Sequence, residues 1–162
     1  MRLLIVWHSA TGGTQQMAAA AAEAAAQEPD VTVSLLPAPR AGVDDLIAAD
    51  GYLFATPENL GAMSGLMKDF FDRTYYPALN RINGRPYASL VCAGTDGNSA
   101  AREISRVATG WRLRAIADPL IIRTGAQATR EIMAPKSIAA DDLEHCRTLG
   151  AAIAAGIALG IY

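Results

Sequence analysis

A short apolar segment followed at once by a small glycine-containing loop constrains this chain more than any other stretch. Residues 3–7 read Leu-Leu-Ile-Val-Trp without a turn residue, which predicts a strand buried on both faces of a parallel sheet. The chain turns polar at His8 and continues as Ser9-Ala10-Thr11-Gly12-Gly13-Thr14. An alanine-rich stretch over residues 15–27 then predicts a helix. The segment therefore predicts a strand, a tight loop and a helix, in that order.

The loop at residues 9–14 has the chemistry of an anion-binding site. The first N–H groups of a helix lack internal acceptors and carry partial positive charge. Glycines let the backbone approach a ligand closely, and three hydroxyl side chains can donate to phosphate oxygens: Ser9, Thr11 and Thr14. The loop contains no Lys or Arg, which predicts that neutral donors alone hold the phosphate. An ordinary strand-to-helix turn with Thr14 as N-cap is the alternative interpretation.

Two familiar phosphate motifs are excluded at this loop. A nucleoside triphosphate loop would end in Gly-Lys-Ser/Thr, and the dinucleotide fingerprint would read Gly-x-Gly-x-x-Gly. Neither pattern is present at residues 9–14.

Composition limits the other functions that the chain could have. A length of 162 residues suits one domain over residues 1–162, and 51% hydrophobic residues with a net charge of −2 favour a folded chain. A pI near 5.6 and the lack of a basic cluster argue against nucleic acid as a partner. Cys92 and Cys146 have no metal or redox spacing, so we expect reduced thiols in a cytoplasmic protein without a metal. Residues 3–7 are too short for a signal peptide, and residues 149–162 are too short for a membrane span.

Strand and helix patterns alternate along the whole chain. Further strands are predicted at residues 31–36, 50–55, 87–93 and 116–122, and further helices at residues 43–49, 66–76, 100–109 and 141–160, with a long loop at residues 124–137. This alternation predicts an α/β fold with a five-stranded parallel sheet and helices on both faces. The second strand alternates in polarity and the fifth contains Pro119, so both have edge character. The predicted strand order is therefore 2-1-3-4-5, with the last helix buried.

Three loops are expected to meet at one edge of this sheet. They follow the first, third and fourth predicted strands and cover residues 9–14, 56–65 and 94–99. In an open parallel sheet, ligands bind beyond the carboxyl ends of the strands where the strand order reverses. The convergence of three glycine-containing loops at that crevice is stronger support for a ligand site than any one of them.

The first two loops also resemble the motifs of a known family. The phosphate loop of flavodoxin-like FMN proteins reads Ser/Thr-x-Thr-Gly-x-Thr, and it is matched by Ser9, Thr11, Gly12 and Thr14. Flavodoxin-like NAD(P)H-dependent oxidoreductases carry Pro-x-x-x-Gly-x-x-Ser/Pro-Gly-x-x-Lys-x-x-x-Asp, which is matched by Pro57, Gly61, Ser64, Gly65, Lys68 and Asp72. The chain is thus similar to the flavodoxin-like FMN-binding family of the NAD(P)H-dependent FMN or quinone reductase type, which implies a flavodoxin-like three-layer sandwich.

The resemblance implies an FMN site with three parts. The phosphate would lie on Ser9, Ala10, Thr11, Gly12, Gly13 and Thr14. The second loop would lie against the flavin ring with Thr56, Pro57, Glu58, Asn59, Leu60, Gly61, Ala62 and Met63. The third loop would flank the pyrimidine edge of the ring with Ala93, Gly94, Thr95, Asp96, Gly97 and Asn98, although Asn98 or Ser99 could instead cap the next helix.

The function implied by the resemblance is an NAD(P)H-dependent reductase of a flavin, quinone or similar small-molecule acceptor. Hydride would pass through N5 of the flavin, so no catalytic side chain is expected. The alternative is a flavodoxin-type electron carrier, but such carriers are usually strongly acidic, whereas this chain has 14 basic and 16 acidic residues. A flavin-binding module with a regulatory partner is a third option. Glycines in the last helix also suggest a possible homo-oligomer.

Four other features have structural alternatives. His8 could be a packed structural histidine, and Trp111 could either stack on the flavin or fill the core. Lys68 and Asp72 are interpreted as an exposed i,i+4 pair on a helix rather than as catalytic groups. His145 and Cys146 are adjacent on a predicted helix and point in different directions, so they form neither a metal site nor a nucleophile pair.

Overall fold

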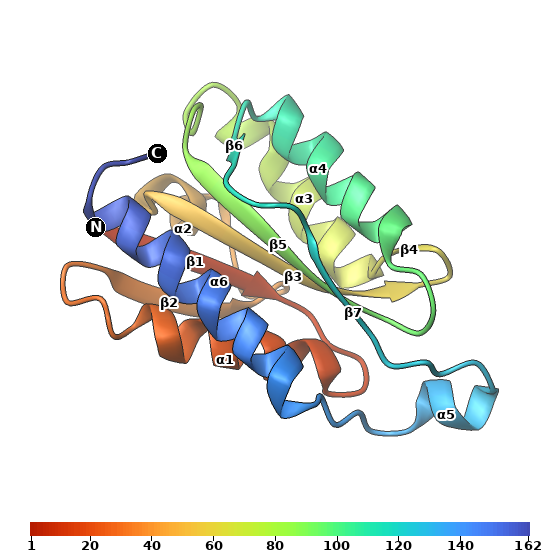
Figure 1. Cartoon of the computed structure of the whole chain (residues 1–162). Coiled ribbons are helices and arrows are strands. Elements are labelled where there is room, and N and C mark those ends of the chain that lie inside the picture. Colours follow the sequence, from red (N-terminus) through yellow and green to blue (C-terminus); the bar gives the residue numbers. More distant parts are fainter.

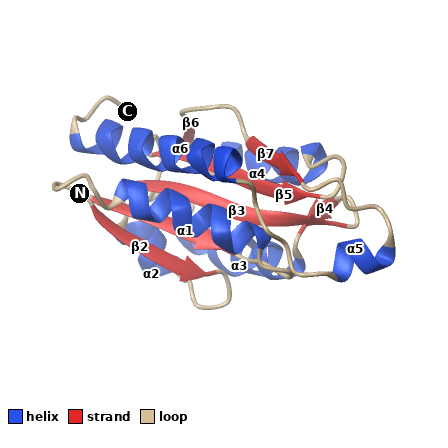
Figure 2. Cartoon of the chain, turned by 60° about the horizontal axis from the view of Figure 1, so that its bottom comes forward, coloured by secondary structure: helices blue, strands red, loops and turns tan.

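A mainly parallel sheet lies between two layers of helices (Figure 1). The computed structural model describes residues 1–162. The strands are β1 (Arg2–Trp7), β2 (Thr32–Pro37), β3 (Gly51–Asn59), β4 (Ala62–Met63), β5 (Pro86–Ala93), β6 (Arg114–Ala115) and β7 (Leu120–Arg123). The helices are α1 (Gly13–Ala25), α2 (Val43–Ala48), α3 (Gly65–Ala78), α4 (Asn98–Gly110), α5 (Thr129–Met133) and α6 (Ala140–Ala158). Figure 2 shows α1 and α6 together on one face of the sheet, with α2, α3 and α4 on the other.

The strand order confirms the predicted flavodoxin-like α/β fold. Strands β2, β1, β3 and β5 lie side by side and are parallel, and β6 and β7 both pair in parallel with the far side of β5. The fourth predicted strand is β5, and β6 and β7 occupy the place of the fifth. The second strand lies at the edge, as its alternating polarity indicated.

The prediction of one continuous fifth strand over residues 116–122 was wrong. The chain pairs with β5 at residues 114–115 and again at residues 120–123, and it leaves the sheet between them. Pro119 lies in this gap and has no N–H to donate to a neighbouring strand. The proline therefore divides the strand in two.

Several element boundaries differ from the sequence prediction. The third strand continues to Asn59 and forms a hairpin with β4, whereas residues 56–65 were expected to be a loop. Part of the long loop at residues 124–137 forms the short helix α5. Helix α3 continues through Pro77, where it was expected to close, and α6 ends at Ala158, before Gly160.

Both alternative N-caps proposed from the sequence were also wrong. Helix α1 begins at Gly13, and its N-cap is Gly12 with φ of 89°, so Thr14 lies inside the helix. Helix α4 begins at Asn98, and its N-cap is Gly97 with φ of 90°. Glycine tolerates this left-handed backbone without a steric penalty, which explains its place at both turns.

Each face of the sheet has its own core. The face under α2, α3 and α4 is rich in aromatic side chains, and Trp111 is fully buried there with its ring 5.6 Å from that of Phe71. Its Nε1 donates to the carbonyl oxygen of Tyr75 at 2.9 Å, so Trp111 is a core residue and does not stack on a ligand. The face under α1 and α6 contains mostly alanine and aliphatic side chains, and small residues bring these two helices close together.

Candidate functional site

The three loops singled out in the sequence lie at one edge of the sheet, beyond the carboxyl ends of β1, β3 and β5 (Figure 1). The first two are joined where β1 ends, because the N–H of His8 donates to the carbonyl oxygen of Ala55 at 3.0 Å. The second and third are joined where the Glu58 carboxylate accepts from the N–H of Gly97 at 2.9 Å. The sheet thus brings together segments that are about forty residues apart in the chain.

The predicted site residues differ in their exposure at this edge. Ala10, Asn59, Leu60, Gly61, Thr95, Asp96 and Asn98 are exposed; Ser9, Thr11, Gly12, Pro57, Glu58, Ala62 and Gly94 are half-buried; Gly13, Thr14, Thr56, Met63, Ala93 and Gly97 are buried.

The loop before α1 presents hydrogen-bond donors that have no acceptor within the protein. Ser9 Oγ accepts from the N–H of Gly12 at 3.0 Å, which closes the turn. The N–H groups of Gly13, Thr14 and Gln15 then donate to nothing in the chain, and the first bond of the helix is made by Gln16 to the carbonyl oxygen of Gly12. Free N–H groups at a helix start attract anions through both hydrogen bonding and the helix dipole.

Thr14 adds a hydroxyl to this set of donors. Its side chain is only 1% exposed, yet Oγ1 has no hydrogen-bond partner. The hydroxyl is close to the Cys92 thiol, but the contact does not meet hydrogen-bond geometry. A buried polar atom without a partner is costly, and it therefore indicates a group that a ligand completes.

Gly13 packs directly over the end of β5. A Cβ atom added at Gly13 would lie 2.7 Å from Cys92 Sγ, so a side chain at this position would collide with the thiol unless the loop or the thiol moved. Burial raises the pKa of the Cys92 thiol, and the positive charge of Lys136 opposes that rise. The thiol is therefore a protonated packing group beneath the loop rather than a nucleophile.

The second loop is held by a hydrogen-bonded network around Ser64. Ser64 Oγ lies 2.9 Å from His8 Nδ1 and 3.2 Å from Thr56 Oγ1, and Thr56 Oγ1 accepts from the N–H of Ser64 at 3.0 Å. Ser64 Oγ also caps α3 by accepting from the N–H of Met67 at 3.4 Å. Burial lowers the pKa of His8, so its ring is neutral at pH 7 and acts as a packed structural partner of Ser64.

Carboxylates fix the hairpin of β3 and β4 against α4. Glu58 accepts from the N–H groups of Gly97 and Ala100, which are at the start of α4, at 2.9 and 3.3 Å. Glu103, one turn further along α4, accepts from the N–H of Met63 at 2.7 Å. The tip of the hairpin remains free, and Leu60 is fully exposed there. The two loops expected to flank a flavin ring are therefore one connected unit.

A fourth segment, which no sequence motif identified, also contacts the site. The N–H of Lys136 donates to the carbonyl oxygen of Thr11 at 2.8 Å. Gln16 joins the same segment to α1, because its Nε2 donates to Lys136 O at 2.7 Å and its Oε1 accepts from the N–H of Ile138 at 3.1 Å. The only sequence signal was topological: this segment follows the last parallel strand, which ends at the same edge.

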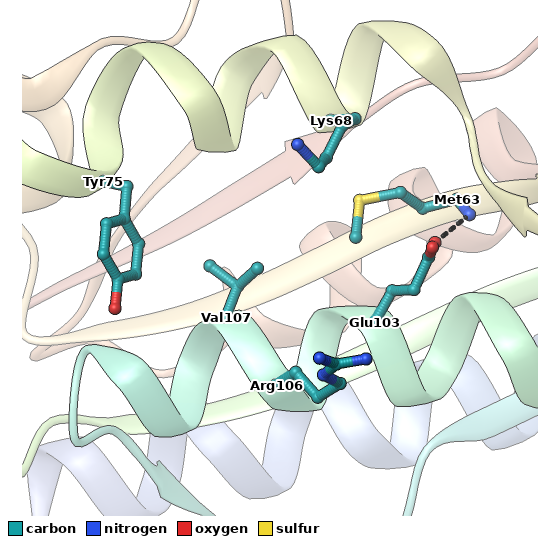
Figure 3. Close-up of a pocket in the computed structure, with 6 residues that line it drawn as sticks. All are labelled: Met63, Lys68, Tyr75, Glu103, Arg106 and Val107. Carbon is teal, nitrogen blue, oxygen red and sulfur yellow. Dashed lines mark hydrogen bonds between the residues drawn. The ribbon is translucent and has the colours of Figure 1, made fainter.

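A groove of about 380 Å³ lies apart from the three loops, between α3 and α4 (Figure 3). Lys68 projects into it from α3, and Arg106 and Glu103 project from α4. Lys68 forms the expected exposed i,i+4 pair with Asp72 at 2.6 Å, which confirms that interpretation. The groove shares only Met63 with the predicted site residues: Met63, Lys68, Tyr75, Glu103, Arg106 and Val107 line it.

Two further observations concern metal ions and membranes. No group of three or more His, Cys, Asp or Glu side chains could hold a metal ion. None of the helices is long and apolar enough to span a bilayer.

Part of the chain matches a known protein family and a curated relative. Residues 36–118, about half of the chain, match the family model described as NADPH-dependent FMN reductase. The matched residues include the second and third loops. The NAD(P)H dehydrogenase (quinone) of Acidithiobacillus ferrooxidans is 36% identical over 93 residues, which are 45% of this chain and 46% of that protein. The alignment thus spans about half the length of that relative.

Other similarities extend over nearly the whole chain. A flavodoxin of Aquifex aeolicus is 26% identical over 167 aligned positions, covering 98% of this chain and 88% of that protein. A solved flavodoxin structure from the domain Archaea superposes with a TM-score of 0.79 at 22% identity, covering 97% of this chain and 99% of that one. The chain is a flavodoxin-like member of the NADPH-dependent FMN reductase family.

Proposed function

We propose that this protein binds FMN at the carboxyl edge of its sheet and catalyses the NAD(P)H-dependent reduction of a flavin, quinone or similar small acceptor. The observation that carries the proposal is the set of unpaired donors before α1. The N–H groups of Gly13, Thr14 and Gln15 and the buried Thr14 hydroxyl all lack acceptors. A phosphate group carries enough acceptor oxygens to satisfy them together.

Each loop at the carboxyl edge of the sheet contacts a different part of FMN in this proposal. The loop at residues 9–14 holds the phosphate, with Ser9 keeping the turn closed through Gly12. The hairpin of β3 and β4 and the loop at residues 94–98 flank the flavin ring, and Glu58 holds them in a fixed relation. Backbone donors and exposed polar side chains at residues 94–98 face the ring edge in this arrangement.

The proposed reaction needs no acid or base from the chain. When bound, FMN supplies hydride transfer at its N5. The protein binds and orients the ring. The ionisable side chains of the two ring loops have structural partners, since Glu58 caps α4 and Asp96 accepts from the Asn98 side chain, and His8 is bonded to Ser64. The proposal places this activity in the cytoplasm, since Cys92 and Cys146 are both free buried thiols.

An electron carrier of flavodoxin type is the second candidate function. Nearly full-length similarity to a flavodoxin supports it. The charge balance supports the enzyme, because 14 basic residues against 16 acidic ones leave little of the negative field by which acidic carriers attract redox partners.

Nicotinamide oxidation separates the two candidates. The purified protein is saturated with FMN and mixed with NADPH or NADH, with and without a quinone. A reductase oxidises the nicotinamide continuously while quinone is present. A protein that is reduced by a chemical reductant but oxidises neither nicotinamide would be a carrier, and the reductase proposal would fail.

A further inference from the structure

The segment that follows β7 places a lysine against the loop at residues 9–14. The N–H of Lys136 donates to the carbonyl oxygen of Thr11 at 2.8 Å, and a Cβ atom built at Gly13 would lie 3.3 Å from the Cβ of Lys136. Gln16 fixes this position through its bonds to Lys136 O and the N–H of Ile138. The backbone of Lys136 therefore packs directly against the loop.

The charge of Lys136 has no anionic partner. Its Nζ donates to the carbonyl oxygens of Glu131 at 2.6 Å, Ile132 at 2.9 Å and Ala134 at 2.6 Å, at the end of α5. The Glu131 carboxylate is used elsewhere, since it accepts from the N–H groups of Gln127 and Ala128. The other lysine of the chain, Lys68, forms an ion pair with Asp72. Lys136 is therefore the lysine whose charge is bonded to carbonyl oxygens alone, and its backbone lies against this loop.

The charge of Lys136 also acts on the thiol that lies beneath the loop. Burial raises the pKa of the Cys92 thiol, and the charge of Lys136 opposes that rise. Cys92 Sγ in turn lies under Gly13 and beside the unpaired Thr14 hydroxyl. The geometry agrees with this direction, since the Cβ of Lys136 lies 3.3 Å from a Cβ atom built at Gly13.

We propose that Lys136 supplies a positive charge to the phosphate site and is a main reason why the protein prefers a flavin that carries a phosphomonoester over one that does not. This inference rests on the proposed FMN site. It differs from the expectation that neutral donors alone hold the phosphate, because the cation comes from a segment about 120 residues away from the loop. Removing the charge therefore weakens FMN binding and leaves riboflavin binding unchanged.

A purely structural role for Lys136 makes a different prediction. A cation at a helix C-terminus bonds the last carbonyls, and Lys136 does so on α5. If that were its whole role, its removal would loosen the segment and affect both flavins equally. The affinity ratio of FMN to riboflavin therefore separates the two roles.

The experiment uses two uncharged variants and one control. Lys136→Met keeps the long side chain, whereas Lys136→Gln keeps a donor for the α5 carbonyls, so both remove the charge but only one removes the cap. Lys68→Gln is the matched control, since it removes the other lysine charge at an exposed site on α3. Dissociation constants for FMN and for riboflavin are measured by flavin fluorescence at low and at high salt.

We expect both Lys136 variants to bind FMN about tenfold more weakly, with unchanged riboflavin affinity and a smaller salt dependence of the FMN affinity. An unchanged ratio of FMN affinity to riboflavin affinity in Lys136→Gln overturns the inference, whether both affinities stay the same or both fall by the same factor. The proposed phosphate site itself fails if the unsubstituted protein binds the two flavins equally. Lys68→Gln should match the parent in every measurement.

Discussion

The Glu58 carboxylate accepts hydrogen bonds from the N–H groups of Gly97 and Ala100, so one side chain of the β3–β4 hairpin caps the start of α4. Helix α4 has no side-chain cap of its own, because its N-cap is Gly97. The cap comes from a residue 39 positions earlier in the chain. A single carboxylate thus stabilises a helix and fixes the two loops expected to flank the flavin ring.

Replacing this carboxylate should affect both stability and binding. Glu58→Ala leaves two N–H groups of α4 without their acceptor, and we expect a loss of about 1 kcal/mol in the free energy of unfolding. FMN affinity should fall as well, because the hairpin and the loop at residues 94–98 lose their connection. Urea unfolding and FMN titration measure the two effects. Glu144→Ala, at an exposed position on α6, is the control and should change stability by less than about 0.5 kcal/mol.

The unpaired Thr14 hydroxyl leads to a second prediction. Thr14→Val keeps the shape of the side chain and removes a buried oxygen without a partner, so the ligand-free protein should be as stable as the parent or more stable. FMN should bind about tenfold more weakly, since a hydrogen bond to a charged phosphate is lost. Removing a second hydroxyl with Thr11→Ala should weaken binding further, although the two losses need not add.

Turnover at saturating FMN tests whether the hydroxyl has only this role. It should recover in Thr14→Val, because the hydroxyl does not contact the reacting ring. Thr74→Val is the matched control: Thr74 is equally buried, but its hydroxyl donates to the carbonyl oxygen of Phe70 on α3. Unchanged FMN affinity in Thr14→Val would contradict the phosphate assignment.

Most of the fold could be predicted because it depends on local patterns. The apolar run at residues 3–7 and the buried strand at residues 87–93 each identify a central strand without any knowledge of the neighbours. The order of the strands followed from edge character, and the position of the site followed from the order. The loop motif at residues 9–14 was also local, since its glycines and hydroxyls are adjacent in the chain.

The parts that could not be predicted depend on distant partners. Residues 56–59 contain Thr56 and Pro57 and look like a loop. They continue β3 because residues 56–57 pair with β5 and residues 58–59 pair with β4. Lys136 gave no local signal, because its place in the site comes from bonds to Thr11 and Gln16. Gly12 and Gly97 replaced the expected hydroxyl and amide caps, since both turns need a positive φ.

Contact between α1 and α6 gives a prediction about stability alone. A Cβ atom at Gly150 would lie 2.1 Å from the carbonyl oxygen of Ala21, which cannot move without breaking α1. Gly150→Ala should therefore destabilise the protein by about 1–3 kcal/mol through overpacking. Gly65→Ala, at the exposed start of α3 with nothing within 4 Å of the new methyl group, is the control and should not destabilise. Chemical unfolding measures the stability of both variants. Equal stabilities would show that α1 and α6 can move apart with little loss of free energy.

The pH dependence of stability should reveal the buried hydroxyl of Tyr52. Burial raises the pKa of Tyr52 from 10.0 to about 12, although Arg85 opposes the rise. The hydroxyl donates to the carbonyl oxygen of Leu46 at 2.7 Å, and the Arg85 guanidinium donates to the hydroxyl at 3.0 Å. Because the folded protein favours the protonated form, this contribution is complete below pH 10 and is lost as the pH rises from 10 towards 12.

Tyr52→Phe isolates that contribution, since every other ionisable group remains in both proteins. Near pH 7 the variant should be less stable by about 1 kcal/mol, because the carbonyl of Leu46 loses a donor. Above pH 10 the parent should lose stability faster than the variant, so the gap between them narrows and then reverses. Urea unfolding at a series of pH values from neutral to alkaline measures both curves. Parallel curves above pH 10 would mean that Tyr52 ionises as easily in the folded protein as in the unfolded chain.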